Sequence, residues 1–79
     1  MATYQEAAFL AHVVNAAFDQ DHPPGVAAPW AGIYRCMGCH KEIGIAHGHV
    51  LPPQTDHQHT PQQGPIRWWL IVYADHNPK

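Results

Sequence analysis

The residues of this chain that could do chemistry are concentrated in one pentapeptide, Cys36-Met37-Gly38-Cys39-His40, which holds both cysteines. Three kinds of site share this pattern. The two thiols and the histidine can attach a c-type haem, the thiols alone can act as a redox dithiol, and the thiols can supply half of the ligands of a zinc ion. The neighbouring residues decide among these alternatives.

A zinc site needs two further ligands, and histidines are abundant nearby. Five of the eight histidines follow Cys39 within twenty residues: His40, His47, His49, His57 and His59. The last two give the pattern Cys-x2-Cys-x17-His-x-His, which is close to the separations that zinc modules use.

Haem attachment and dithiol exchange fit the surroundings less well. A haem attachment motif normally opens a helix, whereas residues typical of strands flank this one, and outside the motif Met1 is the only methionine. A catalytic dithiol usually stands at a helix N-terminus, and Gly44 between two isoleucines argues against a helix after Cys39. A haem protein that uses Cys36, Cys39 and His40 remains as an alternative.

The length of 79 residues allows one small domain, in which a metal ion often adds the stability that a small core lacks. The formal net charge is −2, and the four basic residues are scattered: Arg35, Lys41, Arg67 and Lys79. Scattered cations cannot follow a phosphate backbone, so we expect no nucleic-acid partner.

The N-terminal segment lacks the basic start of a secretory signal, and the longest apolar run, residues 68–73, is too short to span a bilayer. We therefore expect no membrane association and a cytoplasmic location. In that reducing compartment, two nearby cysteines are more typical of metal binding or redox chemistry than of a structural disulfide.

The N-terminal part of the chain has the pattern of a helix. Thr3 and Glu6 fit a capping box, and the apolar residues between positions 7 and 19 recur at three- and four-residue steps. Pro23, Pro24 and Gly25 then end the helix. We assign residues 1–24 to one amphipathic helix and a proline-rich linker, and residues 25–79 to the domain that carries the cysteines.

Short extended segments are predicted at residues 32–36, 42–46 and 66–73. The last has two apolar faces, with Trp68 in the core and the opposite face covered by the N-terminal helix. Residues 48–65, rich in Pro, Gln, His and Thr, form a connection that a small domain would hardly order without help. The predicted fold is small α+β, a three-stranded antiparallel sheet with an N-terminal helix.

Residues 30–72 resemble the bacterial zinc-ribbon, rubredoxin-like small proteins. In those proteins a Gly-x-Tyr-x-Cys-x-x-Cys-Gly knuckle is followed by a second strand, by Leu-Pro-x-Cys-Pro-x-Cys, and by a closing strand that begins with Trp. Residues 32–39 match the first knuckle, Leu51-Pro52-Pro53 matches the approach to the second, and Trp68 matches the closing strand. His40 and Gln58 stand where each knuckle usually has its following glycine.

The resemblance places the third ligand at Gln54 and the fourth at His57. Glutamine is a poor zinc ligand, so a histidine must replace it, and His59 or His49 could do so. We therefore predict one structural zinc ion bound by Cys36, Cys39, His57 and His59, with His49 as the alternative fourth ligand.

A structural zinc module of this size suits the presentation of a surface to another protein, whose identity the sequence leaves open. Catalytic zinc needs an open coordination position and a general base in a cleft. The two glutamates, Glu6 and Glu42, are expected on a helix and a strand, so we do not expect an enzyme. The alternative is a metal-handling protein whose additional histidines bind zinc, nickel or copper reversibly and pass it on.

Overall fold

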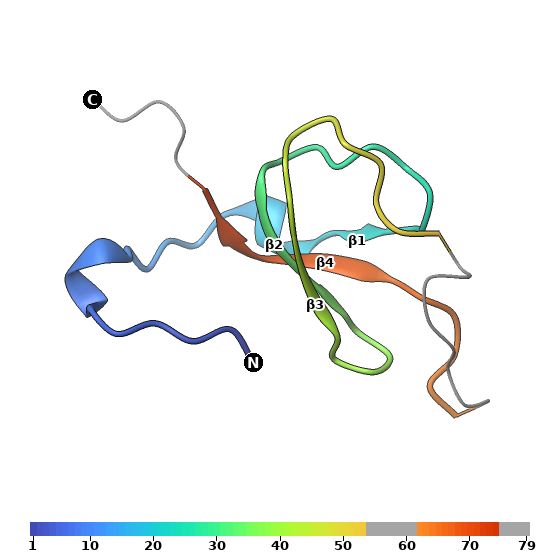
Figure 1. Cartoon of the computed structure of the whole chain (residues 1–79), viewed down its shortest axis with the longest axis horizontal. Coiled ribbons are helices and arrows are strands. Elements are labelled where there is room, and N and C mark those ends of the chain that lie inside the picture. Colours follow the sequence, from blue (N-terminus) through green and yellow to red (C-terminus); the bar gives the residue numbers. More distant parts are fainter. Residues whose placement is uncertain (54–61, 75–79) are drawn as a thin grey trace.

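The computed structural model describes residues 1–53 and 62–74, within which four strands form an antiparallel sheet (Figure 1). The strands are β1 (Asp21–His22), β2 (Gly32–Cys36), β3 (Glu42–Ile45) and β4 (Trp68–Tyr73). Their order is β1-β4-β2-β3, so β2 lies between β4 and β3. Two short 3-10 helices, η1 (Ala7–Phe9) and η2 (Ala16–Asp19), precede the sheet.

The antiparallel sheet is confirmed, with one more strand than predicted. β2 has the predicted bounds, β3 ends one residue earlier than predicted, and β4 begins two residues later. The additional strand, β1, has only two residues, and it pairs His22 with Trp68 at the free side of β4. Residues 21–22, assigned from the sequence to the linker, therefore contribute to the same sheet.

The prediction of one amphipathic helix over residues 7–19 is wrong, because the structure has only two short 3-10 helices there. The backbone of Leu10 between them is extended. Local hydrogen bonds favour the turns, since Glu6 accepts from the N–H of Ala8, and Oδ1 of Asn15 accepts from the N–H of Ala17 at 2.8 Å. η1 buries no residue, and a short helix is stable mainly when its apolar face packs.

The helices within residues 1–53 and 62–74 are too short, or too poor in apolar residues, to cross a membrane.

The core lies on one face of the two long strands. Tyr34 and Cys36 of β2 lie opposite Leu70 and Trp68 of β4, and all four side chains are fully buried. They alternate along each strand with less buried residues, as expected for a sheet with one face against a core. The predicted core position of Trp68 is confirmed.

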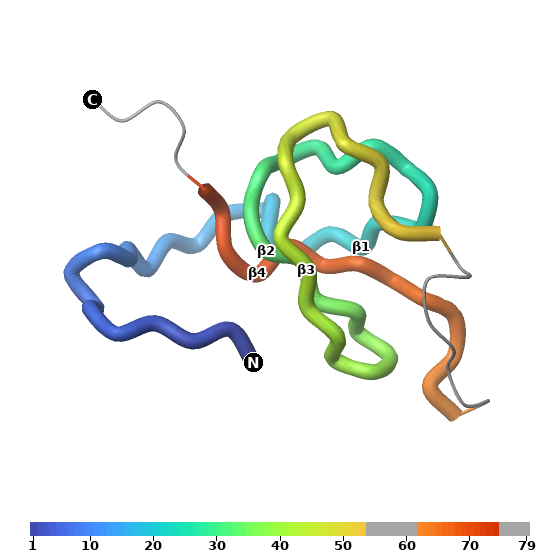
Figure 2. Tube along the Cα trace, in the orientation of Figure 1, coloured from blue at the N-terminus to red at the C-terminus, as the bar shows by residue number. Residues whose placement is uncertain are grey.

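Two segments outside the named strands cover this core. Residues 25–28 and 48–51 run side by side, and an isolated bridge pairs Ala27 with Val50 (Figure 2). Between them, the N–H of Leu51 donates to the carbonyl of Val26 at 2.7 Å, and the side chain of Leu51 is fully buried. The second of these two segments is therefore fixed to the core at Leu51.

Gly32 allows β2 and β4 to approach closely at their far end. Its φ is 153°, and a Cβ at this position would overlap the carbonyl oxygen of Val72. Beyond it the ladder has a bulge, because Ile33 pairs with Val72 whereas Tyr34 pairs with Leu70. The bulge shifts the register by one residue, so that Tyr34 faces Leu70 in the core.

Candidate metal centre

Cys36 ends β2 and Cys39 lies in the turn that leads to β3; we call residues 36–41 the cysteine turn. Two backbone hydrogen bonds close it: the N–H of His40 donates to the carbonyl of Cys36 at 2.8 Å, and the N–H of Cys36 donates to the carbonyl of Lys41 at 2.7 Å. Cys36 is fully buried, Cys39 is half-buried against the same core, and no disulfide joins them. The turn therefore carries two thiols on one short closed loop beside the core, an arrangement that can offer both to one ion.

His40 gives the cysteine turn its shape. Its φ is 69°, and no other non-glycine residue among those described has a positive φ. The left-handed conformation costs an L-residue about 1–2 kcal/mol, and glycine adopts it freely. His40 occupies the position after the second cysteine, where the knuckle pattern used in the sequence prediction has glycine. The turn thus has a backbone that favours glycine, although the side chain is different.

Pro52 and Arg67, which precede and follow residues 53–66, are both held close to Cys36. The indole N–H of Trp68, the residue opposite Cys36, donates to the carbonyl of Pro52 at 3.2 Å. On the return, the N–H of Met37 donates to the carbonyl of Arg67 at 2.9 Å. Pro52 and Arg67 therefore both lie near the cysteine turn.

Two of the predicted zinc ligands, His57 and His59, lie outside the described residues, as does Gln54. Their participation stays a prediction.

His49, the alternative fourth ligand, is not brought to the cysteines. It lies in an exposed turn closed by a hydrogen bond from its N–H to the carbonyl of Ala46 at 3.1 Å. This turn follows Ile45, whereas the cysteine turn precedes Glu42, so the length of β3, about 10 Å, separates them (Figure 1). Within the described part of the chain, no three His, Cys, Asp or Glu side chains are grouped to hold a metal ion.

The strand that follows the cysteine turn bears on the redox-dithiol alternative. The residues that follow Cys39 form β3, so this cysteine does not stand at the N-terminus of a helix. The turn therefore does not have the usual setting of a catalytic dithiol, which stands at the N-terminus of a helix.

A buried histidine that the sequence analysis did not single out lies on the other side of Trp68. His22 is buried, and its Nε2 has no hydrogen-bond partner among the described residues. Its ring lies edge-on to those of Trp30 and Tyr34, with both centroid distances at 5.8 Å. Burial lowers the pKa of His22 below its usual 6.5, and the charge of Asp21 opposes this change. A two-residue strand has too little periodicity to reveal such a residue from sequence.

Tyr34 ties β2 to the preceding loop. Its hydroxyl donates to the carbonyl of Trp30 at 2.7 Å and accepts from the N–H of the same residue at 3.2 Å. Burial raises the pKa of Tyr34 above its usual 10.0, and the hydrogen bond to Trp30 partly opposes that rise. The phenol is therefore a neutral structural group two residues before Cys36.

No family model matches the chain, and no solved structure matches it. A curated relative, named "Protein L" and from Escherichia coli, is 50% identical over 52 residues. The match covers 66% of this chain and 59% of the relative, so the chain spans less than two thirds of that protein's length. The name "Protein L" states no ligand and no reaction, so the cysteine turn is the main guide to function.

Proposed function

We propose that this chain is a small zinc-ribbon-like protein that binds one structural zinc ion. The ligands are Cys36, Cys39, His57 and a second histidine, with His59 ahead of His49. The observation that carries the proposal is the left-handed backbone of His40 in a closed turn that holds both thiols. Thiolates and imidazoles in a tetrahedral set are the ligands that structural zinc prefers.

The hydrogen bonds at Pro52 and Arg67 support ligands from the far loop. Both bonds lie next to Cys36 or Trp68, so Pro52 and Arg67 are held near the cysteine turn, and the proposal takes its two histidine ligands from the sequence between them. The exposed turn at His49 lies at the other end of β3, which favours His59 over His49 as the fourth ligand.

The metal ion has a structural role in this proposal. Binding at such sites contributes on the order of 10–16 kcal/mol of apparent free energy, against a total stability of about 5–15 kcal/mol for a typical domain. A four-stranded sheet with short strands has little core of its own, so folding depends on the ion. The surface held in this way binds another protein in the reducing cytoplasm, without nucleic acid, membrane or catalysis.

A metal-handling function is the second candidate, and the exposure of three imidazoles favours it. His40, His47 and His49 are all exposed, and none of them is needed for the core. Exposed histidines can bind zinc, nickel or copper reversibly. In that case the ion leaves the protein while the sheet stays folded.

The test is elemental analysis of the natively purified protein together with a thiol titration. We expect one zinc ion per chain and two thiols that react only after a chelator is added. The chelator should also unfold the sheet, followed by tryptophan fluorescence. Release of metal with the fold intact would favour the metal-handling function. An absorption band of covalent haem would overturn both.

Matched variants locate the ligands. His57→Gln and His59→Gln should each weaken zinc binding, whereas His47→Gln, in the exposed turn beyond β3, should leave affinity and stoichiometry unchanged. If His47→Gln and His57→Gln lower zinc content equally, the four-ligand structural site is wrong.

A further inference from the structure

The cysteine turn contains both thiols of the chain and, between them, the thioether of Met37. The hydrogen bond from the N–H of His40 to the carbonyl of Cys36, at 2.8 Å, joins residues four positions apart, as in one turn of an α-helix. On such a turn, side chains three positions apart are neighbours, with about 5–6 Å between their Cβ atoms. The side chains of Cys36 and Cys39 are therefore close enough to bind the same ion.

The two thiols border an apolar core. Cys36 is fully buried in a cluster that includes Leu51 and Trp68, and Cys39 is half-buried against the same cluster. Apolar surroundings disfavour two separate thiolate charges and a strongly hydrated cation, because neither keeps its water there. They also limit the access of solvent to a bound metal and so influence its redox potential. The position therefore favours a soft ion of low charge that needs little water.

Copper(I) is an ion of this kind. Thiolate ligands select it, and it forms stable complexes with two thiolates, whereas structural zinc takes four ligands. Within residues 1–53 and 62–74, no three His, Cys, Asp or Glu side chains are grouped to hold a metal, but the two thiols share one closed turn. Copper(I) can use this pair without the histidines that the proposed zinc site needs. Copper(II) instead prefers nitrogen and oxygen ligands in a tetragonal arrangement.

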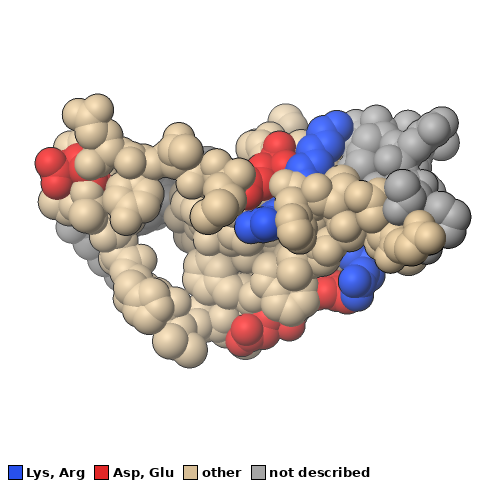
Figure 3. All heavy atoms as spheres, turned by 90° about the horizontal axis from the view of Figure 1, so that it is seen from below, with Lys and Arg blue, Asp and Glu red and all other residues tan. Residues whose placement is uncertain are grey.

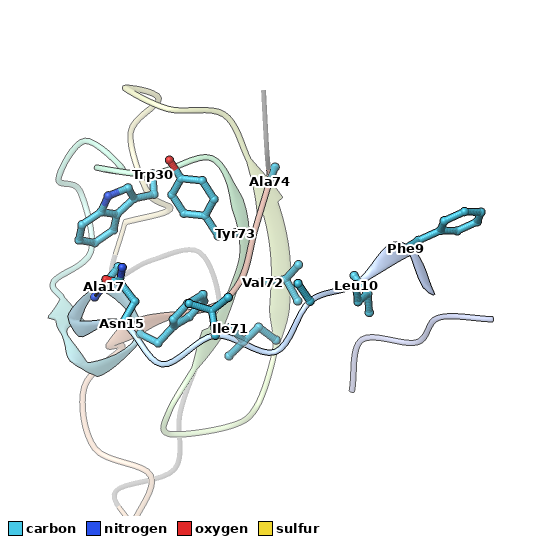
Figure 4. A pocket seen from close by; sticks show the side chains of 12 residues that line it. Phe9, Leu10, Asn15, Ala17, Trp30, Ile71, Val72, Tyr73 and Ala74 are labelled. Carbon is cyan, nitrogen blue, oxygen red and sulfur yellow. Dashed lines mark hydrogen bonds between the residues drawn. The ribbon is translucent and has the colours of Figure 1, made fainter. Parts of the chain in front are cut away.

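Two other features of the described surface lack ligands of this kind. The groove between the N-terminal segment and the end of β4 is lined by residues such as Leu10, Phe18 and Val72, and no thiol, thioether, imidazole or carboxylate lines it (Figure 4). On the face shown in Figure 3, acidic and basic side chains are interspersed, so a hard cation finds no gathered carboxylates there. The sulfur atoms of the cysteine turn are therefore the best-defined metal ligands on the described surface.

We propose that Cys36 and Cys39 bind one copper(I) ion between their thiolates. Each thiol gives up its proton to the solvent and forms a bond to the metal, and no atom is oxidised or reduced. The complex keeps one negative charge, less than the two of a free thiolate pair. This site shares its thiols with the proposed zinc ion but does not rest on it, because it needs neither His57 nor His59.

The experiment adds copper(I), in the absence of oxygen, to the natively purified full chain in competition with bicinchoninate, whose copper(I) complex is coloured. We expect one copper(I) ion per chain and the release of any zinc that the protein holds, since both ions use the same sulfur atoms. X-ray absorption at the copper edge should then show two sulfur neighbours and no nitrogen. Nitrogen neighbours would assign the copper to histidines and overturn the proposal, and so would copper(I) that binds while zinc stays in place.

Variants identify the ligands independently. Cys39→Ser should weaken copper(I) binding by more than about a hundredfold, because the loss of even an outer-shell partner costs a metal site about 10–100-fold. Met37→Leu is the matched control, since it removes the third sulfur of the turn from a side chain that is 39% exposed, and it should leave the affinity unchanged. Combined His57→Gln and His59→Gln changes should also leave it unchanged. Equal losses from Cys39→Ser and Met37→Leu, or a loss from the histidine changes, would contradict a site of two thiolates.

The copper and zinc proposals can fail separately in these measurements. A purified protein that holds one zinc ion and takes up no copper(I) would overturn the copper site and leave the zinc site standing. A protein that holds no zinc but binds copper(I) through two sulfur atoms would support the copper site and overturn the structural zinc site.

Discussion

Trp68 faces Cys36 across the β2–β4 ladder, and its indole N–H donates to the carbonyl of Pro52 at 3.2 Å. One fully buried side chain thus joins the strand that ends in the first cysteine to the segment that precedes the predicted histidine ligands. The position of Trp68 fixes where that segment starts relative to the cysteine turn.

Trp68→Phe should therefore weaken both the fold and metal binding. The change removes one hydrogen bond and part of a buried side chain, with an expected loss of about 2 kcal/mol in the free energy of unfolding. Urea denaturation of the metal-loaded protein measures it. Trp69→Phe, at the half-buried neighbouring position, should cost less and leave zinc affinity unchanged. Equal losses in the two variants would show that Trp68 has no special place at the site.

His40→Gly should stabilise the metal-loaded protein by about 1 kcal/mol. The left-handed backbone costs histidine about 1–2 kcal/mol, and the greater freedom of glycine in the unfolded chain offsets only part of this gain. His40→Ala is the control, since alanine meets the same cost and should give no gain. Thermal unfolding compares the three proteins. A loss of metal from His40→Gly would instead identify the imidazole as a ligand, as the haem alternative requires.

The strands could be predicted because apolar side chains recur at two-residue steps along them, and in the structure the burial of the side chains alternates in the same way. Tyr34 and Cys36, like Trp68 and Leu70, are spaced by two residues and face one core. The bridge between Ala27 and Val50 was not predictable, because it joins distant segments through backbone hydrogen bonds that leave no pattern in side-chain types.

The prediction of an N-terminal helix was wrong for a different reason. The spacing of Phe9, Val13 and Val14 indicates which side chains need burial, but it does not say whether the same chain offers a surface to bury them. In the structure these side chains are exposed, and local bonds at Glu6 and Asn15 take the place of the helical ladder. A helical period in the sequence is therefore not enough for a helix when the chain offers no surface on which the apolar side chains can pack.

The candidate site was predictable in part. The spacing of Cys36 and Cys39 between two strands indicated the turn, and the glycine expected at position 40 from the predicted zinc-ribbon pattern agrees with its left-handed backbone. The burial of His22 was not predictable, because it depends on a two-residue strand that forms only when β4 is in place.

His22 should make the fold sensitive to acid. Its pKa is lowered in the folded state, mainly by burial, so the folded protein binds fewer protons than the unfolded chain once the pH falls below about 6.5. Stability should be constant above that pH with respect to this residue, and should decrease as the pH falls toward the lowered pKa. The charge of Asp21, which lies 3.6 Å from Arg67, reduces the effect without reversing it.

His22→Phe tests this expectation, because a phenyl ring can keep the edge-on contacts with Trp30 and Tyr34 without binding a proton. Urea denaturation at a series of pH values between about 7 and 5 should give a shallower loss of stability for this variant than for the unchanged protein. Acid would also release the proposed zinc ion from its thiolate and imidazole ligands, but it would do so in both proteins, so the difference between their slopes belongs to His22. His12→Gln, a change at an exposed position, should leave the slope as it is. Identical slopes for His22→Phe and the unchanged protein would mean that the buried imidazole takes up its proton without opening the sheet.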